Sequence, residues 1–296
     1  MIGMADRDAS IYDVLVFKLA FSANAFKKNT LAEAIDAIAD IGYAGVELMA
    51  DAPHIVPLEA LSAEVETITD QLSARNLVVS NVNAFTGFFD GDTYHPTWIE
   101  DDPERVTVRV NHTLSCVRLA AAVSARTVSL QPGGPLIGTS LSRHDAGTRF
   151  ADGIARVLPT ARELGITLAI EPEPGLLIQT SAEFHEFKQT FFADDPLVQM
   201  NCDVGHLFCV GEDPAEVIRR YAHNIAHVHL EDIGGNRVHQ HLTPGRGAID
   251  FRSIFLALRE IRYHGWATVE LYPYETTAAG VAGRAFAHLD PILRSI

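Results

Sequence analysis

The chain has 296 residues, 47% of them hydrophobic, so it is long enough to bury a large core in one or two domains. Its 23 lysines and arginines stand against 38 aspartates and glutamates, and a net charge of −15 with no basic run disfavours a nucleic-acid partner. Only three cysteines, an N-terminus unlike a signal peptide and the lack of a membrane-length apolar run predict a cytoplasmic protein without membrane contact.

Short β-rich apolar runs alternate eight times with longer segments in which apolar residues recur every three or four positions. Most of the runs are interpreted as apolar on both faces, which is typical of strands buried in a parallel sheet. The predicted strands span 14–21, 44–49, 77–83, 126–131, 166–171, 197–203, 225–230 and 267–272.

The segments between the strands carry helix start and stop signals. Thr30 and Glu33 have the spacing of a capping box, and Gly42 supplies a left-handed stop. Asp213 and Asp250 are expected to cap later helices. Besides the helix between Thr30 and Gly42, helices are predicted near 58–72, 103–124, 143–164, 181–192, 213–222, 250–263 and 276–293.

Eight strand–helix units without a long linker predict an α/β fold, a single closed (β/α)8 TIM barrel with a parallel eight-stranded core. We expect an N-terminal tail at 1–12 and one catalytic barrel domain at 13–296. No G-x-G-x-x-G motif follows an early strand, which disfavours a Rossmann fold. The longer connections follow strands, and in a barrel this end carries the active site.

Polar side chains terminate the predicted apolar strands: Glu47, Asn83, Gln131, Glu171, Asp203, His229 and Glu270. A carboxylate at such a position is costly unless it is paired, protonated or bound to a cation. Barrel closure brings the ends of the last four strands together, so Glu171, Asp203, His229 and Glu270 are expected to converge. Three carboxylates and one imidazole suit Mn²⁺ foremost, with Mg²⁺, Co²⁺ or Zn²⁺ as alternatives.

Each of these residues also has an ordinary structural interpretation. A single strand-end glutamate is more often an ion-pair partner than a ligand, and Asp203 suits a side-chain cap of a turn. His229 follows His227 in H-V-H-L, and we expect one ring to face the barrel interior and the other to pack outward. The four residues taken together favour a metal site.

Six motifs make the chain resemble the xylose isomerase-like barrel superfamily of sugar isomerases, ketose 3-epimerases, inosose dehydratases and endonuclease IV-type enzymes. The resemblance covers nearly the whole chain from about residue 16. The motifs are G-V-E-L at 45–48, A-I-E-P at 169–172, C-D-V-G-H at 202–206, H-V-H-L-E-D at 227–232, P-G-R-G-A-I-D at 244–250 and T-V-E-L at 268–271.

This resemblance implies a metal-dependent sugar or cyclitol isomerase/epimerase that removes a proton next to a carbonyl through a metal-stabilised enediolate. It makes Glu171 and Glu270 the acid/base pair and places His206 and Arg237 near substrate hydroxyls. It also implies that the metal ligands are Glu171, Asp203, His229 and Glu270.

Further side chains are expected on the substrate side. Glu47 would accept a sugar hydroxyl, or else form a salt bridge. His239 and His241 stand where endonuclease-type members carry a D-x-H motif for a second metal. We assign both to substrate contact, with an exposed loop position as the alternative. Asn83 and Gln131 replace histidines of those enzymes, so they are grouped with the substrate contacts and no trinuclear zinc cluster is expected.

The connection at 84–102 contains more aromatic residues than an ordinary solvated turn: Phe85, Phe88, Phe89, Tyr94 and Trp98. This composition predicts either a lid that excludes water from the reaction or a contact between subunits of a homo-oligomer.

Other functions remain open at this point. A lyase of the inosose or dehydroshikimate dehydratase type would use the same metal and base but expel a β-hydroxyl. A non-catalytic sugar-binding subunit would keep the site as a relic, although nothing would then offset the cost of clustered carboxylates. An endonuclease IV-like phosphodiesterase comes last, because the acidic chain repels a phosphate backbone.

Overall fold

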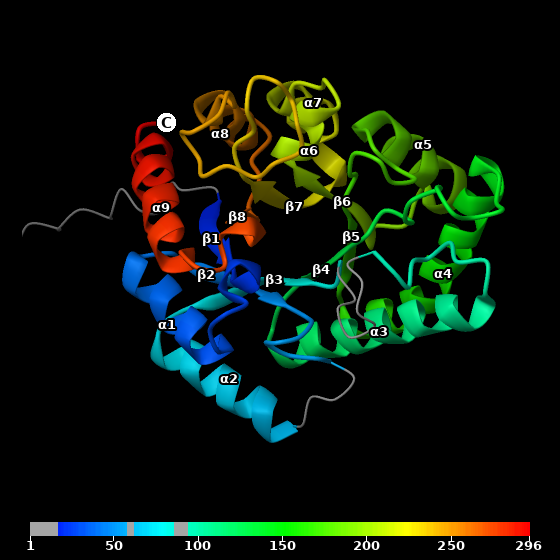
Figure 1. Ribbon diagram of the computed structural model, residues 1–296, viewed down its shortest axis with the longest axis horizontal. Coiled ribbons are helices and arrows are strands. Elements are labelled where there is room, and N and C mark those ends of the chain that lie inside the picture. Colours follow the sequence, from blue (N-terminus) through cyan, green and yellow to red (C-terminus); the bar gives the residue numbers. More distant parts are fainter. Residues whose placement is uncertain (1–16, 58–61, 86–93) are drawn as a thin grey trace, which may run out of the picture.

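The computed structural model describes residues 17–57, 62–85 and 94–296, and their strands form one closed barrel (Figure 1). Each strand pairs in parallel with the next in the chain, and the last pairs with the first. The predicted eight-stranded parallel barrel is therefore confirmed. The strands are β1 Lys18–Ser22, β2 Gly45–Met49, β3 Val78–Asn83, β4 Thr127–Leu130, β5 Thr167–Ile170, β6 Val198–Asp203, β7 Ile225–Leu230 and β8 Trp266–Val269.

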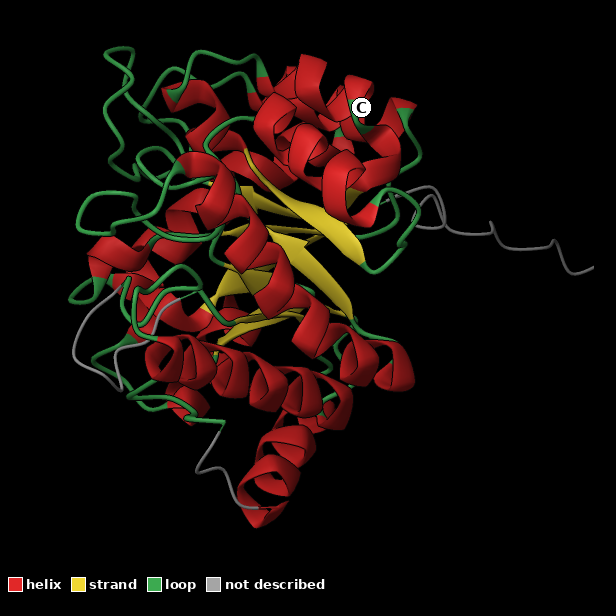
Figure 2. Cartoon of the chain, turned by 90° about the vertical axis from the view of Figure 1, so that its right-hand side faces the viewer, coloured by secondary structure: helices red, strands yellow, loops and turns green. Residues whose placement is uncertain are grey.

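Helices surround the strands, and the long loops gather at one end of the barrel (Figure 2). No described helix is both long and apolar enough to cross a membrane. The expected tail at 1–12, the first residues of the first predicted strand and the start of the second predicted helix lie outside the described residues. The helices are α1 Leu31–Ile41, α2 Ser62–Ala74, α3 Pro103–Ala122, α4 Arg143–Leu164, α5 Ser181–Phe192, α6 Val204–Cys209, α7 Pro214–Arg220, α8 Phe251–Glu260 and α9 Ala278–Arg294.

The predicted helix caps are confirmed. Thr30 Oγ1 accepts a hydrogen bond from Glu33 N, and the Glu33 carboxylate accepts one from Thr30 N, which completes the capping box of α1. Gly42 ends that helix with a φ of 110°, a conformation that favours glycine. Asp213 and Asp250 accept backbone hydrogen bonds at the starts of α7 and α8.

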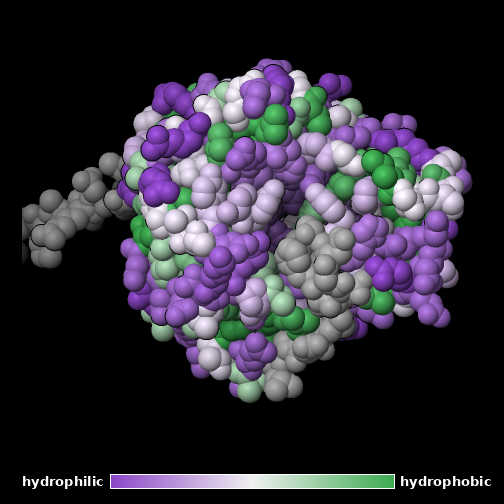
Figure 3. Space-filling model, viewed as in Figure 1, coloured by the Kyte–Doolittle hydropathy of each residue, from purple (hydrophilic) through white to green (hydrophobic). Residues whose placement is uncertain are grey.

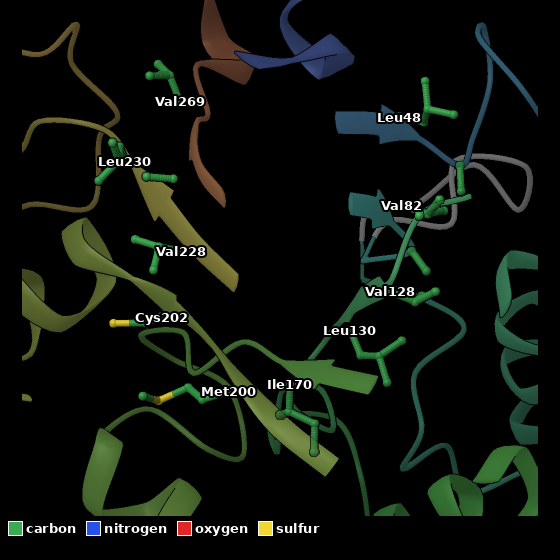
Figure 4. Close-up of a cluster of buried hydrophobic side chains, with 14 of the residues drawn as sticks. Leu48, Val82, Val128, Leu130, Ile170, Met200, Cys202, Val228, Leu230 and Val269 are labelled. Carbon is green, nitrogen blue, oxygen red and sulfur yellow. The ribbon is translucent and has the colours of Figure 1, made fainter. Parts of the chain in front are cut away.

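Alternate strand residues point in opposite directions, and the two faces of the barrel wall differ in chemistry. Inside the barrel the side chains are largely polar: Asn81 Nδ2 donates to Ser129 Oγ (2.8 Å). Ser80, the extra residue of a β-bulge in the pairing of β2 with β3, also points inward, and its Oγ contacts Thr268 Oγ1 (3.2 Å). The prediction of strands apolar on both faces is therefore wrong for the inner face, where hydrogen bonds link several of the polar groups. The apolar residues that alternate with them include Leu48, Val82, Val128, Leu130, Ile170, Met200, Cys202, Val228, Leu230 and Val269 (Figure 4).

Candidate metal centre

A cavity of about 460 Å³ lies at the end of the barrel where the strands terminate. In the view of Figure 1, the space-filling surface shows a recess near the middle of the ring of elements, bordered mainly by hydrophilic residues (Figure 3). The cavity lining consists of Asn24, Lys27, Met49, Asn83, Phe85, Tyr94, Glu171, Glu173, His206, His239, His241, Glu270 and Tyr272.

Closure of the barrel brings the four expected ligands together. One side-chain atom from each of Glu171, Asp203, His229 and Glu270 lies within 4.8 Å of the others, and all four residues are buried. Glu171 and Glu270 directly follow β5 and β8, Asp203 is the last residue of β6, and His229 is the next-to-last residue of β7. Glu171 and Glu270 line the cavity, whereas Asp203 and His229 are not part of its lining.

The two carboxylate oxygens of Asp203 have different surroundings, and one caps a helix while the other faces the cluster. Oδ1 accepts a hydrogen bond from His206 N (2.7 Å) and caps α6, so the capping interpretation is confirmed. Oδ2 is buried and accepts no hydrogen bond from a nitrogen donor of the described residues, and the carboxyl group of Glu231 lies beside the Asp203 carboxylate. A buried carboxylate oxygen without a nitrogen donor, beside two further carboxylates and an imidazole, fits a divalent cation, and this O/N donor set suits Mn²⁺, Mg²⁺, Co²⁺ or Zn²⁺.

The imidazole of His229 lies between the carboxylate of Glu47 on one side and three carboxylates on the other. Its Nδ1 is 3.1 Å from Glu171 Oε1 and 3.8 Å from both Asp203 Oδ2 and Glu270 Oε2, and its Nε2 is 2.7 Å from Glu47 Oε2.

His227 also reaches Glu47, with Nε2 at 3.5 Å from Oε2. The expectation that only one of His227 and His229 faces the interior is therefore wrong, since residues two apart on a strand share a face.

The pKa values in this cluster reflect burial of acids around one base. Burial raises the pKa of Glu171 to about 6 and that of Glu270 well above its ordinary value, and the positive charge of His229 offsets only part of the effect. Burial lowers the pKa of His229, but the negative charges of Glu47, Glu171 and Glu270 outweigh it and leave that pKa well above its ordinary value. A divalent cation would displace protons from this cluster on binding.

Four of the predicted substrate contacts line the cavity: Asn83, His206, His239 and His241. His206 Nδ1 donates to Pro172 O and His241 Nδ1 donates to Glu270 O, both at 3.1 Å. Burial lowers the pKa of His206 to about 3 and that of His241 to about 4, so both rings are neutral at pH 7. The exposed-loop alternative is wrong for His241, which is buried, and His239 is half-buried.

The other three predicted substrate contacts do not line the cavity. Glu47 is fully buried. Gln131 is also buried, and its Nε2 donates to Tyr94 O (3.0 Å). Arg237 extends over the ring of Phe208, with the guanidinium carbon 4.5 Å from the ring centroid and Nη1 donating to Phe208 O. In this structure its guanidinium is thus held against Phe208 of α6.

The aromatic connection after β3 is divided between the cavity and the core. Phe85 and Tyr94 line the cavity, whereas Trp98 is fully buried and packs against Phe150 with ring centroids 5.6 Å apart. Trp98 is therefore a core residue, which neither the lid nor the subunit-contact interpretation anticipates. Phe88 and Phe89 lie outside the described residues.

Several cavity residues have no predicted role in the sequence: Asn24, Lys27, Met49, Glu173 and Tyr272. Asn24 Nδ2 donates to Glu270 Oε1 (2.8 Å), and Tyr94 Oη donates to Glu173 Oε1 (3.1 Å). Burial, together with the neighbouring charge of Glu171, raises the pKa of Glu173 to about 8. The position of Glu173, two residues after the strand-end carboxylate Glu171, was the sequence feature that could have predicted a place in the cavity.

The model of the xylose isomerase-like TIM barrel family matches residues 35–292. The chain belongs to this family. Among curated relatives, the inosose dehydratase of Clostridium botulinum (strain Alaska E43 / Type E3) is 26% identical over 262 residues, which cover 82% of this chain and 83% of the relative.

Several solved structures share the fold of this xylose isomerase-like chain. D-psicose 3-epimerase in the presence of D-fructose aligns with a TM-score of 0.77 at 17% identity, covering 94% of this chain and 99% of the other. The IolI protein with a bound zinc atom aligns with a TM-score of 0.75 at 17% identity, covering 94% of this chain and 98% of the other. At these identities the likeness is one of fold.

Proposed function

We propose that this protein is a divalent-metal-dependent isomerase or epimerase of a sugar or cyclitol. The observation that carries the proposal is the arrangement of the four-residue cluster. Glu171 and Glu270 line the cavity, while Asp203 and His229 complete the cluster from outside the lining. The fold shared with D-psicose 3-epimerase supports the reaction class, and the zinc atom in IolI supports a metal in this fold.

In this proposal, Glu171, Asp203, His229 and Glu270 would hold a divalent cation, which would supply Lewis-acid polarisation for the substrate carbonyl. One of the two cavity carboxylates removes a proton from the carbon next to the carbonyl, and the other returns one. Asn24 and Asn83 donate to Glu270 Oε1 (2.8 and 3.2 Å), which fixes the orientation of that carboxyl group. The position and face at which the proton returns distinguish an isomerase from an epimerase.

We further propose Mn²⁺ as the ion, with Mg²⁺, Co²⁺ and Zn²⁺ as alternatives that the same donors accept. His206, His239 and His241 would contact substrate hydroxyls as neutral rings, which both donate and accept hydrogen bonds. Glu173, held by Tyr94, would also contact the substrate.

Glu270→Gln tests the acid/base assignment. The amide keeps the size of the side chain but cannot take up a proton, so the metal-loaded variant should lose solvent deuterium incorporation into ketoses and inososes by at least about 100-fold. Glu163→Gln, on the exposed side of α4, is the matched control and should retain exchange. Full exchange in a folded Glu270→Gln protein would contradict the assignment.

A dehydratase is the second candidate, and two observations favour it. The relative from Clostridium botulinum, 26% identical over 82% of this chain, is an inosose dehydratase. In addition, a third carboxyl group, Glu173, lines the cavity beside the proposed acid/base pair. Mass spectrometry of the product separates the two candidates, since isomerisation or epimerisation keeps the substrate mass and dehydration removes one water.

A further inference from the structure

Glu47 is a fully buried carboxylate behind the metal centre, where a substrate in the cavity does not reach it. Its Oε2 accepts hydrogen bonds from His229 Nε2 (2.7 Å) and Asn81 Nδ2 (2.8 Å). Its Oε1 accepts one from Asn83 Nδ2 (3.2 Å). The proposed function uses none of these contacts, so the role of this carboxylate is open.

The two nitrogens of His229 face different surroundings. Nδ1 faces the other three proposed ligands, at 3.1 Å from Glu171 Oε1 and 3.8 Å from the oxygens of Asp203 and Glu270. Nε2 faces Glu47. A neutral imidazole carries a proton on one nitrogen and a lone pair on the other, so a partner that accepts from Nε2 leaves Nδ1 as the ligand atom.

We propose that Glu47 is a positioning residue that holds the Nε2–H of His229 and thereby makes Nδ1 the metal-ligating nitrogen. A carboxylate behind a ligating histidine fixes the ring orientation and raises the basicity of the ligand. The inference rests on the proposed metal centre but not on the reaction or the substrate.

The neighbours of Glu47 hold it in this role. Asn81 Nδ2 also contacts Ser129 Oγ (2.8 Å), and Asn81 Oδ1 accepts from Thr127 Oγ1 (2.8 Å), so its amide is oriented with the NH₂ group toward Glu47. The network joins β2, β3 and β4 to β7 through the barrel interior. In Glu47→Gln, one acceptor oxygen becomes an NH₂ donor that faces these existing donors.

Zinc affinity and histidine NMR test the proposal, with Zn²⁺ as a diamagnetic probe. At fixed pH, competition with a chelator should show zinc binding about 10- to 100-fold weaker in Glu47→Gln than in the wild type. Glu212→Gln is the matched control, since Glu212 also accepts two hydrogen bonds, from Ser181 N (2.9 Å) and Oγ (2.5 Å), away from the cluster. It should bind zinc as the wild type does.

Long-range ¹H–¹⁵N spectra of the zinc-loaded wild type should show His229 protonated at Nε2 and metal-bound at Nδ1. This measurement uses only the wild-type protein, so it tests the proposal even if Glu47→Gln does not fold. Zinc bound through Nε2, or unchanged affinity in a folded Glu47→Gln protein, overturns the role of Glu47 alone. No zinc binding by the wild type overturns this inference together with the metal centre of the proposed function.

Discussion

The carboxyl group of Glu231 occupies the space into which a side chain at Gly205 would project: a Cβ built on Gly205 would overlap Glu231 Oε1. Glu231 directly follows β7 and is fully buried, and Gly205 lies in the first turn of α6. Burial and the neighbouring charge of Asp203 raise the pKa of Glu231 well above its ordinary value. The glycine therefore makes room for a carboxyl group next to a proposed metal ligand.

Gly205→Ala should destabilise the protein by about 1–3 kcal/mol, because the added methyl group displaces the Glu231 carboxyl in a packed interior. Gly283→Ala is the control. That glycine lies within α9, and a Cβ added there would meet no neighbouring side chain within 4 Å among the described residues, so the change should be neutral or stabilise by about 0.5–1 kcal/mol. Urea unfolding measures both. Equal stability of the two variants would show that Glu231 relocates without cost.

Metal binding should stabilise the fold. With Mn²⁺ at 100 times its dissociation constant, the free energy of unfolding should rise by about 2.7 kcal/mol over the chelator-treated protein. Asp203→Asn should remove most of this gain, because it removes the charge of the buried ligand while asparagine still caps α6. Thermal unfolding with and without Mn²⁺ checks this, and an equal gain in the variant would exclude Asp203 as a ligand.

Arg109 donates hydrogen bonds to both described parts of the connection after β3, residues 84–85 and 94–102. Its buried guanidinium donates to Ala84 O and Phe85 O (both 3.2 Å) and to Pro96 O (2.6 Å). Arg109→Met leaves these carbonyls without that donor and should cost about 2–4 kcal/mol of unfolding free energy. It should also raise KM more than it lowers kcat, since Phe85 lines the cavity.

Arg118→Met is the control for Arg109→Met, because Arg118 is exposed on the same helix and its loss should change stability by less than about 0.5 kcal/mol. Arg109→Lys should recover part of the loss. Urea unfolding and steady-state kinetics on an identified substrate measure these effects, and wild-type stability and KM in Arg109→Met would refute the role of these hydrogen bonds.

Stability should fall in acid partly through His112 on α3, whose Nε2 lies 3.5 Å from Cys116 Sγ. Burial, and then the charge of Arg109, lower the pKa of His112 to about 3. In the unfolded chain the pKa of His112 is about 6.5, so below that pH the unfolded chain binds a proton on His112. The folded protein binds this proton only near pH 3. Stability is therefore present above about pH 6.5 and is lost as the pH falls.

At pH 5 this effect of His112 lowers the free energy of unfolding by on the order of 2 kcal/mol. His112→Gln should flatten the difference in unfolding free energy between pH 8 and pH 5, whereas His144→Gln, on the exposed start of α4, should not. Urea titrations at the two pH values make the comparison. The same pH slope in all three proteins would contradict the linkage.

The repeating pattern of the sequence predicts the barrel well because strand and helix periods are local. The caps at Thr30, Asp213 and Asp250 depend on neighbouring residues only, and they are confirmed. Helix α6 was not predicted, since a segment of six residues is too short to show a helical period.

Side-chain positions across the barrel were harder to predict. Convergence of the strand-end residues follows from parallel closure, and the structure brings Glu171, Asp203, His229 and Glu270 together. The positions of Glu47 and Arg237 outside the cavity lining could not be predicted for a different reason. Depth below a barrel rim and the direction of a long side chain depend on residues distant in sequence, such as Asn81 for Glu47, or on packing such as that of Arg237 on Phe208.

All four proposed ligands come from the second half of the chain, whereas side chains from the first half hold two of them. Glu47 reaches His229 across 182 positions, and Asn24 reaches Glu270 across 246. Closing a loop of this length costs more conformational entropy than closing a short one, so these pairs depend on the rest of the barrel to hold them together. A fragment with only β5 to β8 would contain all four ligands but neither Glu47 nor Asn24. Tight metal binding would therefore indicate that the N-terminal part of the chain has packed against the C-terminal part and closed the barrel.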